Sequence, residues 1–293
     1  MSQIKGSIVA LVTPFHEDGS VNYEKLDEML EWHIAEGTDG ILVLGTTGES
    51  TTMSHEEDDA VAKFAIDHVA HRVPVIVGTG SNSTQTALEK SLRAADMGAD
   101  LLLTISPYYN KANKEGMYHH FADVADKTKC PIIVYNVPGR TGCSVSEDVM
   151  ARLAKHPNVY GVKEASGNIS YLTNIATLVD DNFHLYSGND DMITSTLSLG
   201  GSGVISVLAN VAPKDTHNMV MEWFNGNPKG SLDLQLKYLD LIRSLFCEVN
   251  PIPVKEALNL MGMDVGPFRM PLYPMDPKNR ARLEKSLKDV GLL

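Results

Sequence analysis

A lysine at the end of a buried strand is the residue of this sequence best suited to covalent chemistry. Lys163 ends the apolar run 159–163 and precedes Glu164-Ala-Ser166. Burial disfavours the ammonium form of lysine and lowers its pKa, which makes the amine a nucleophile toward carbonyl groups. The alternative is a lysine that extends from a strand end into solvent. The residues that gather near Lys163 decide between the two.

Hydroxyl groups and possible anion binders follow other apolar runs. The turn 45–48 has two glycines around two threonines, so its backbone N–H groups and hydroxyls can bind a carboxylate. Tyr109, Tyr135 and Arg140 follow later runs. Singly, each has an ordinary alternative, since tyrosine hydroxyls often anchor loops. Together with Lys163 they are what Schiff-base chemistry on a keto acid requires.

Short apolar runs and amphipathic stretches alternate along the first three quarters of the chain. The runs are rich in Val, Ile and Leu and are too short for helices, as expected for strands of a parallel sheet buried on both faces. They cover residues 7–13, 40–44, 75–78, 101–105, 132–136, 159–163, 184–187 and 203–207. Between them, helix starts are predicted at Asn22, Ser54, Ser83 and Ser146, and helix ends at Gly37 and Gly98.

Eight strands that each precede a helix predict a (β/α)8 TIM barrel, with the active site at the carboxyl ends of the strands. A doubly wound open sheet is the alternative, but no G-x-G-x-x-G follows the first strand. The strand pattern stops near residue 227, and helical patterns follow at 230–246, 254–261 and 277–290. We therefore expect a barrel domain over 1–226 and a C-terminal three-helix subdomain over 227–293.

Composition excludes several classes of partner. The formal net charge is −12, and no Lys/Arg cluster is longer than a pair, so nucleic acid and anionic membrane surfaces are poor partners. The three cysteines are widely spaced and form no C-x-x-C, which argues against a disulfide scaffold and a zinc site. No signal peptide or membrane span is evident, so a cytoplasmic protein is expected. We also expect no metal and no other cofactor.

Five longer motifs stand out in the sequence. They are Gly45-Thr46-Thr47-Gly-Glu49, Tyr135-Asn-Val-Pro-Gly-Arg140-Thr-Gly, Gly161-Val-Lys163-Glu-Ala, Gly203-Val-Ile-Ser206 and Asn250-Pro-Ile-Pro-Val-Lys255. Together they resemble the family of pyruvate-dependent class I aldolases and N-acetylneuraminate lyases, and within it the dihydrodipicolinate synthase branch. The likeness runs from Gly6 to Gly291.

The resemblance implies a reaction. Lys163 would form a Schiff base with pyruvate, and the enamine would attack L-aspartate-4-semialdehyde. The product would be 4-hydroxy-tetrahydrodipicolinate, in the first committed step of lysine biosynthesis by the diaminopimelate pathway. Sibling lyases for N-acetylneuraminate or keto-deoxy sugars are an alternative, as is a non-catalytic barrel. Thr46-Thr47 and Arg140 favour the synthase, and retention of Lys163 and Tyr135 argues against loss of catalysis.

Residue roles follow from the same resemblance. Tyr135, Thr46 and Tyr109 would relay protons, and Tyr109 would come from the neighbouring subunit of a tight dimer. The resemblance also implies a homotetramer built as a dimer of dimers. Thr47 would bind the pyruvate carboxylate and Arg140 the semialdehyde carboxylate. Gly188 and Ile205 end the seventh and eighth strands and would line the site.

An effector site for lysine is expected to be degraded. The resemblance places it at Ser50, His55, Asn82 and Tyr108, together with two positions where this chain departs from lysine-sensitive relatives. Asp58 stands where they have a second His, and Thr86 stands where they have the Glu that binds the effector's ammonium group. Weak or absent inhibition by lysine is predicted, because the effector loses a charged partner.

Overall fold

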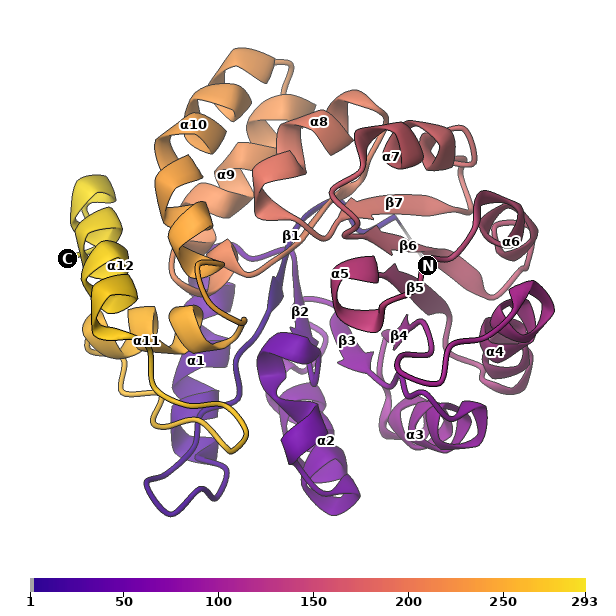
Figure 1. Ribbon diagram of the computed structural model, residues 1–293, viewed down its shortest axis with the longest axis horizontal. Helices are drawn as coiled ribbons and strands as arrows, with labels where there is room; N and C mark the ends of the chain where they lie inside the picture. Colours follow the sequence, from indigo (N-terminus) through magenta and orange to yellow (C-terminus); the bar gives the residue numbers. More distant parts are fainter. Residues whose placement is uncertain (1–2) are drawn as a thin grey trace.

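The computed structural model describes residues 3–293, and eight parallel strands of that range form one closed barrel (Figure 1). Each strand pairs with the next in the sequence, and the last pairs with the first. The predicted (β/α)8 barrel is thereby confirmed. The strands are β1 (Gly6–Ala10), β2 (Gly40–Val43), β3 (Val75–Gly78), β4 (Leu101–Ile105), β5 (Ile132–Asn136), β6 (Val159–Glu164), β7 (His184–Ser187) and β8 (Gly203–Ser206).

Helices follow the strands and form the outer ring of the barrel (Figure 1). Asn22, Ser54 and Ser83 cap helices through their side chains as predicted, whereas the Ser146 hydroxyl makes no capping bond. The helices are α1 (Tyr23–Ala35), α2 (His55–Val69), α3 (Thr84–Met97), α4 (Lys114–Lys127), α5 (Pro138–Thr141), α6 (Glu147–Leu153), α7 (Ile169–Ala176), α8 (Ile193–Ser198), α9 (Pro213–Phe224), α10 (Pro228–Leu245), α11 (Ile252–Leu260) and α12 (Pro277–Val290).

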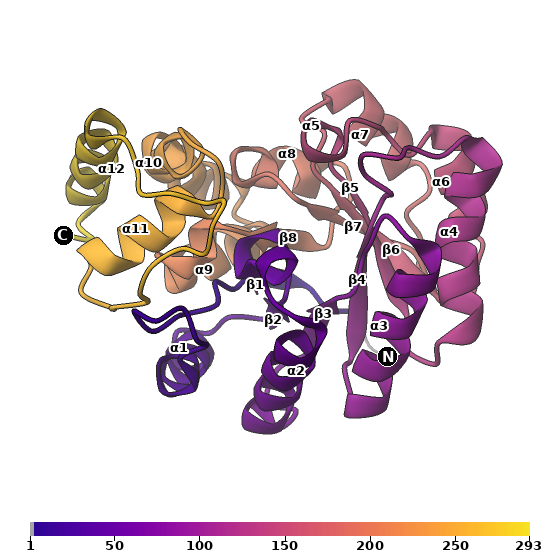
Figure 2. The same cartoon turned by 60° about the horizontal axis from the view of Figure 1, so that its bottom comes forward.

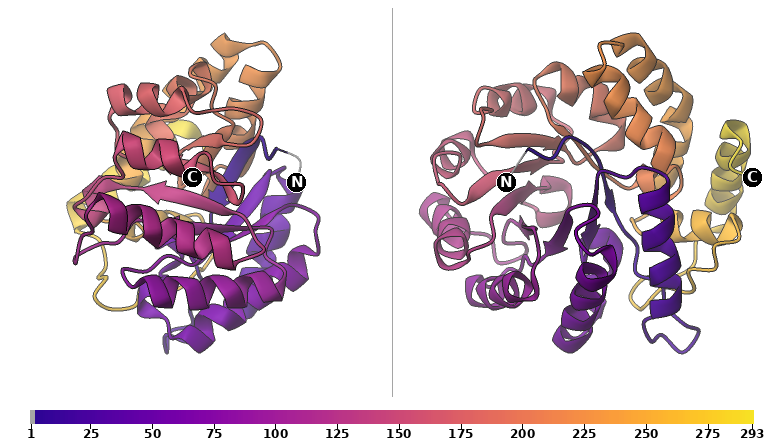
Figure 3. Two further views of the ribbon diagram at one scale, coloured as in Figure 1. Left: turned by 90° about the vertical axis from the view of Figure 1, so that its right-hand side faces the viewer. Right: turned by 180° about the vertical axis from the view of Figure 1, so that it is seen from behind.

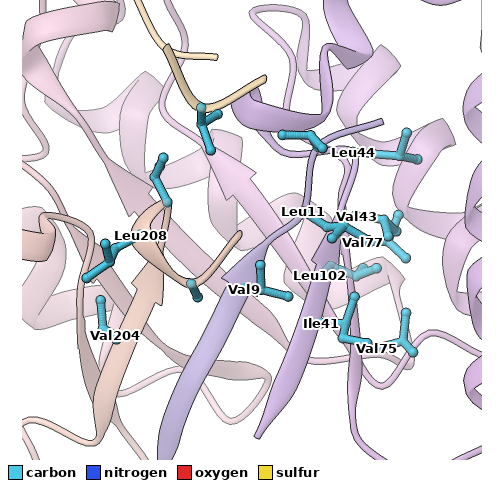
Figure 4. Close-up of a cluster of buried hydrophobic side chains, with 14 of the residues drawn as sticks. Val9, Leu11, Ile41, Val43, Leu44, Val75, Val77, Leu102, Val204 and Leu208 are labelled. Atoms are coloured by element: carbon cyan, nitrogen blue, oxygen red, sulfur yellow. The ribbon is translucent and has the colours of Figure 1, made fainter. Parts of the chain in front are cut away.

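Alternate strand residues face two separate cores. One set fills the barrel interior and includes Ile8, Leu42, Ile76, Ile133 and Tyr186. The intervening residues pack outward against the helices, and Figure 4 shows part of this layer around Val9, Ile41, Val43, Val75 and Val77. Both faces are apolar because a parallel barrel sheet is covered on both sides.

The first strand is shorter than its apolar run. A strand over 7–13 was predicted, but β1 ends at Ala10. The reason is Asn210, whose Nδ2 donates to the Ala10 carbonyl (2.8 Å) and whose Oδ1 accepts from the Val12 N–H (3.1 Å). This side chain takes over the backbone groups at the strand end, so Leu11 and Val12 stay buried outside the ladder.

Helices α10, α11 and α12 lie together on one side of the barrel, beside α1 and α9 (Figures 1 and 2). The view from behind in Figure 3 shows α12 as the outermost of them. A C-terminal helical part therefore follows the barrel, and its division from the barrel at 226/227 stays a prediction. Within residues 3–293, no helix combines the length and apolar character needed to cross a membrane.

Candidate active site

Lys163 lies inside the carboxyl end of the barrel. Its register partners are Tyr135 on β5 and Tyr186 on β7, and both belong to the interior core. Residues paired in register point to the same face of a sheet, so the Lys163 side chain also points inward. Its Nζ lies 4.4 Å from the centre of the Tyr135 ring, and the residue is 6% exposed. The alternative, a lysine that extends from the strand end into solvent, is thus excluded.

The surroundings of Lys163 favour the neutral amine. The pKa of Lys163 is lowered to about 7, chiefly by burial; the negative charge of Asp190 opposes this shift, and the positive charge of Arg140 adds to it. Because a free lysine has a pKa near 10.4, a far larger fraction of Lys163 is a nucleophilic amine at neutral pH.

Asp190 is a site residue that sequence reasoning missed. Its Oδ2 accepts from the N–H groups of Val207 (3.0 Å) and Leu208 (2.9 Å), and the residue is 2% exposed. Burial raises the pKa of the Asp190 carboxyl group. The only sequence signal was the position of this acid, directly after the seventh strand.

Gly188 leaves room for the lysine. A Cβ added there would lie 2.6 Å from the Ala165 Cβ and 3.2 Å from Lys163 Cε, closer than side chains normally approach. Ile205 is fully buried on β8 and belongs to the interior core. Gly188 thus lies against Lys163 and Ile205 lies inside the barrel on β8; their role in lining the substrate site stays a prediction.

Tyr135 and Thr46 form a hydroxyl pair beside the amine. Burial raises the pKa of the Tyr135 phenol, and the positive charge of Arg140 and the nearby Thr46 hydroxyl lower it by a smaller amount. The phenol is therefore protonated at neutral pH and can donate a proton to an oxygen that leaves the carbon bound to Lys163.

The turn after β2 presents Thr47 to the same end of the barrel. Residues Thr46–Gly48 form a single 3₁₀ turn, and the first N–H groups of such a turn have no partner within it. Thr47 is 3% exposed, and its Oγ1 accepts from Asn250 Nδ2 at 2.9 Å. These groups can bind a carboxylate.

Asn250 joins the two predicted carboxylate binders. Besides its bond to Thr47, its carbonyl accepts from the Arg140 guanidinium at 3.2 Å. Arg140 lies in α5 and is exposed, and its charge is near enough to Lys163 to lower the pKa of the amine. Sequence reasoning assigned Asn250 no role, although it opens the motif of residues 250–255.

Among the predicted site residues, Tyr109 is the one that does not meet the others within a single subunit. Its side chain is 91% exposed, and its backbone has a positive φ of 69°. Few tyrosines are so exposed, and this one lies on the β4–α4 connection at the same end of the barrel as Lys163. A proton relay through Tyr109 thus needs a further subunit.

Two of the candidate effector residues lie next to the hydroxyl pair. Ser50 and Tyr108 line a cavity of about 80 Å³ together with Thr46 and Tyr135. The Asn82 carbonyl accepts from Asn110 at 3.0 Å, and His55 is exposed at the start of α2. Asp58 is buried and pairs with Lys90 at 2.8 Å, so its charge is already matched within the chain.

Comparisons with known proteins agree on one family. The model of the dihydrodipicolinate synthetase family matches residues 3–290. A protein of Clostridium perfringens (strain SM101) named 4-hydroxy-tetrahydrodipicolinate synthase is 52% identical over 289 residues, which are 99% of each chain.

Solved structures give the same result. A chloride-inhibited dihydrodipicolinate synthase from Acinetobacter baumannii in complex with pyruvate is 42% identical, with a TM-score of 0.96 over 99% of this chain and 100% of that one. A monomeric dihydrodipicolinate synthase variant is 40% identical, with a TM-score of 0.97 over 99% and 98% of the two chains. This chain belongs to the dihydrodipicolinate synthetase family.

Proposed function

We propose that this protein is a 4-hydroxy-tetrahydrodipicolinate synthase, a lyase that condenses pyruvate with L-aspartate-4-semialdehyde. The observation that carries the proposal is the buried amine of Lys163, with a pKa of about 7, beside the Tyr135 phenol. Full-length relatives that are about 50% identical to this chain bear the name of that activity.

The amine of Lys163 attacks the carbonyl carbon of pyruvate, and the resulting carbinolamine loses water to give an imine. Tyr135 gives the departing hydroxyl group its proton, which leaves the phenolate stabilised by the Thr46 hydroxyl. Loss of a methyl proton then converts the imine to an enamine. Its carbon attacks the aldehyde of the second substrate, and the oxygen of that aldehyde becomes a hydroxyl group.

Ring closure releases the product. The amino group of the condensed semialdehyde attacks the imine carbon and displaces the amine of Lys163, so the enzyme returns to its starting state. Besides the bonds formed and broken at carbon, these steps need only proton transfers. Tyr135 lies close enough to Lys163 to serve both imine formation and its reversal. No electrons are exchanged with a cofactor in this sequence of steps.

The two carboxylates are bound at different places. The pyruvate carboxylate is bound by Thr47 and the free N–H groups of its turn, which keeps the keto carbon next to Lys163. The semialdehyde carboxylate is bound by Arg140 at the entrance, where a guanidinium can make two parallel hydrogen bonds.

The active unit is a dimer in which Tyr109 completes the site of the neighbouring subunit, and two dimers form a tetramer. The exposure of Tyr109 supports the first contact. Ile169 on α7 (51% exposed) and Leu236 on α10 (57% exposed) offer apolar surface elsewhere for the second (Figure 1). A related synthase variant is monomeric, so the mass of this assembly must be measured by sedimentation.

An assay with purified protein tests the activity. Consumption of pyruvate together with L-aspartate-4-semialdehyde, with the heterocyclic product identified by mass spectrometry, is the expected result. Cleavage of N-acetylneuraminate without condensation would instead identify a sibling lyase. No turnover of either substrate would indicate a non-catalytic barrel.

A further inference from the structure

The turn that carries Thr46 and Thr47 takes its shape from Glu49. This residue has a φ of 56°, in the left-handed region that residues other than glycine seldom adopt. Its N–H donates to the Thr46 carbonyl (3.2 Å), and its own carbonyl accepts from the N–H and hydroxyl of Thr52 (3.0 Å each). A rotation of the Glu49 backbone would therefore also move Thr46, which is bonded to it.

The Glu49 carboxylate is held by a lysine from the far end of the sequence. Lys255 of α11 donates to Glu49 Oε1 at 2.8 Å, and both side chains are fully buried. The ammonium also donates to the Pro267 carbonyl (2.6 Å) and lies 4.4 Å from the centre of the Phe15 ring. Removing one member of such a pair leaves the other charge buried and unmatched.

A second cation of the same segment holds the other end of the turn. The Arg269 N–H donates to Glu49 Oε2 (3.2 Å), and its guanidinium donates to the Thr52 carbonyl (3.1 Å). The guanidinium also makes two bonds to Glu57 in the first turn of α2, at 2.6 and 2.8 Å. The turn is thus fixed against both the C-terminal segment and the helix that follows it.

We infer that residues 250–269 are a positioning clamp for the carboxylate-binding turn, with the Glu49–Lys255 ion pair as its central contact. The clamp touches the turn at Thr47 through Asn250, at Glu49 through Lys255 and at Thr52 through Arg269. Lys255 and Glu49 act through Thr46 and Thr47 and are positioning residues. The inference rests on the proposed function, because Thr47 matters only if a carboxylate binds there.

Loss of the clamp should affect pyruvate more than the chemistry of Lys163. In Lys255→Met the unmatched Glu49 carboxylate turns toward water and displaces the turn. A misplacement of about 1 Å at a binding site can cost about a hundredfold. The pyruvate concentration for half-maximal borohydride trapping on Lys163 is therefore expected to rise at least about tenfold.

A ketone without a carboxylate separates positioning from general damage. Acetone can form the same imine with Lys163 but makes no use of the turn. Its trapping on Lys163, measured on the isolated peptide by mass spectrometry, should be unchanged in Lys255→Met. The control is Lys237→Met, which breaks an ion pair of 3.0 Å to Asp215, between α10 and α9, and should leave both reactions as in the wild type.

Two further variants keep the test decisive if Lys255→Met does not fold. Glu49→Gln retains an oxygen that accepts from Lys255, so it should lose less pyruvate affinity than Lys255→Met. The double variant Glu49→Gln/Lys255→Met removes both charges of the pair, so neither is left unmatched; it should fold and still need more pyruvate. Equal loss with pyruvate and acetone, or no change with either, would overturn the clamp. Failure of the wild type to trap pyruvate would instead overturn the proposed function.

Discussion

The amine of Lys163 and the ring of Tyr135 face each other across neighbouring strands, with 4.4 Å between Nζ and the ring centre. The relationship follows from the barrel itself, because residues paired in register on β5 and β6 project to the same side. The phenol is thereby fixed near the atoms that react at the amine. Imine formation and proton transfer can take place without a large movement of either side chain.

Removal of the Tyr135 hydroxyl should slow turnover and leave the fold intact. General acid–base groups contribute about a hundredfold to ten-thousandfold, so kcat of Tyr135→Phe is expected to fall by about that factor. Tyr160→Phe is the matched control, since this buried tyrosine of β6 accepts from the Ile4 N–H at 2.8 Å, away from Lys163. Similar losses in both variants would show that ring packing, and not proton transfer, was disturbed.

The rate of imine formation should rise as the pH passes through about 7. Burial lowers the pKa of Lys163 to about 7, so one pH unit below that value about a tenth of the amine is free, and one unit above it about nine tenths. Stopped-flow measurement of pyruvate binding from about 2 pH units below this pKa to about 2 units above it would follow the titration.

Two charge variants should move this profile in opposite directions. Arg140 lowers the pKa of Lys163 and Asp190 raises it. Arg140→Ala is therefore expected to shift the midpoint to higher pH, and Asp190→Asn to lower pH. A midpoint that stays in place in both variants, or an inflection only near the pKa of free lysine, would contradict the assigned environment.

Two inactive variants should restore activity when mixed. If Tyr109 serves the neighbouring subunit, a dimer of one Lys163→Ala chain and one Tyr109→Ala chain contains one complete site. After dissociation and random reassembly, about a quarter of all sites would be complete. Recovery of that order in a turnover assay is expected. Absence of recovery, with mixed dimers demonstrated by mass spectrometry, would place Tyr109 outside the partner's site.

Lysine should be a weak inhibitor or none. Thr86 carries no charge to bind an effector ammonium, and the Asp58 carboxylate is buried against Lys90. The missing partner should weaken lysine binding by about 1–3 kcal/mol, several-fold to a hundredfold. A rate assay over a series of lysine concentrations checks this, and inhibition at micromolar lysine would show that the site still works.

The barrel could be predicted from local signals. The one strand end discussed above that was predicted wrongly has an identifiable cause. Strands β3, β4, β5 and β7 begin and end where their apolar runs do, because turn residues bound them. The first run is longer than its strand, since Leu11 and Val12 are buried in the apolar core while the Val12 N–H donates to Asn210 instead of to a neighbouring strand. Apolar character reports burial, and a side chain about 200 residues away decided the hydrogen bonds.

The site could be predicted where a residue lies at or just after the carboxyl end of a strand. Lys163, Tyr135 and Thr46 meet because strand ends converge in a barrel. Asn250 and Lys255 were not predicted as parts of the site, because their partners Thr47 and Glu49 lie more than 200 residues earlier. Such contacts depend on how the C-terminal helices fold back over the barrel, which no local pattern specifies.

Mass spectrometry after borohydride reduction in the presence of pyruvate is the most direct test of the central claim. The reduced imine should appear as a mass increase on the peptide that contains Lys163, and only when pyruvate is present. Lys163→Ala should show no such increase and no turnover, while its circular dichroism matches that of the wild type. A mass increase on another lysine, or none at all, would contradict the Schiff-base mechanism.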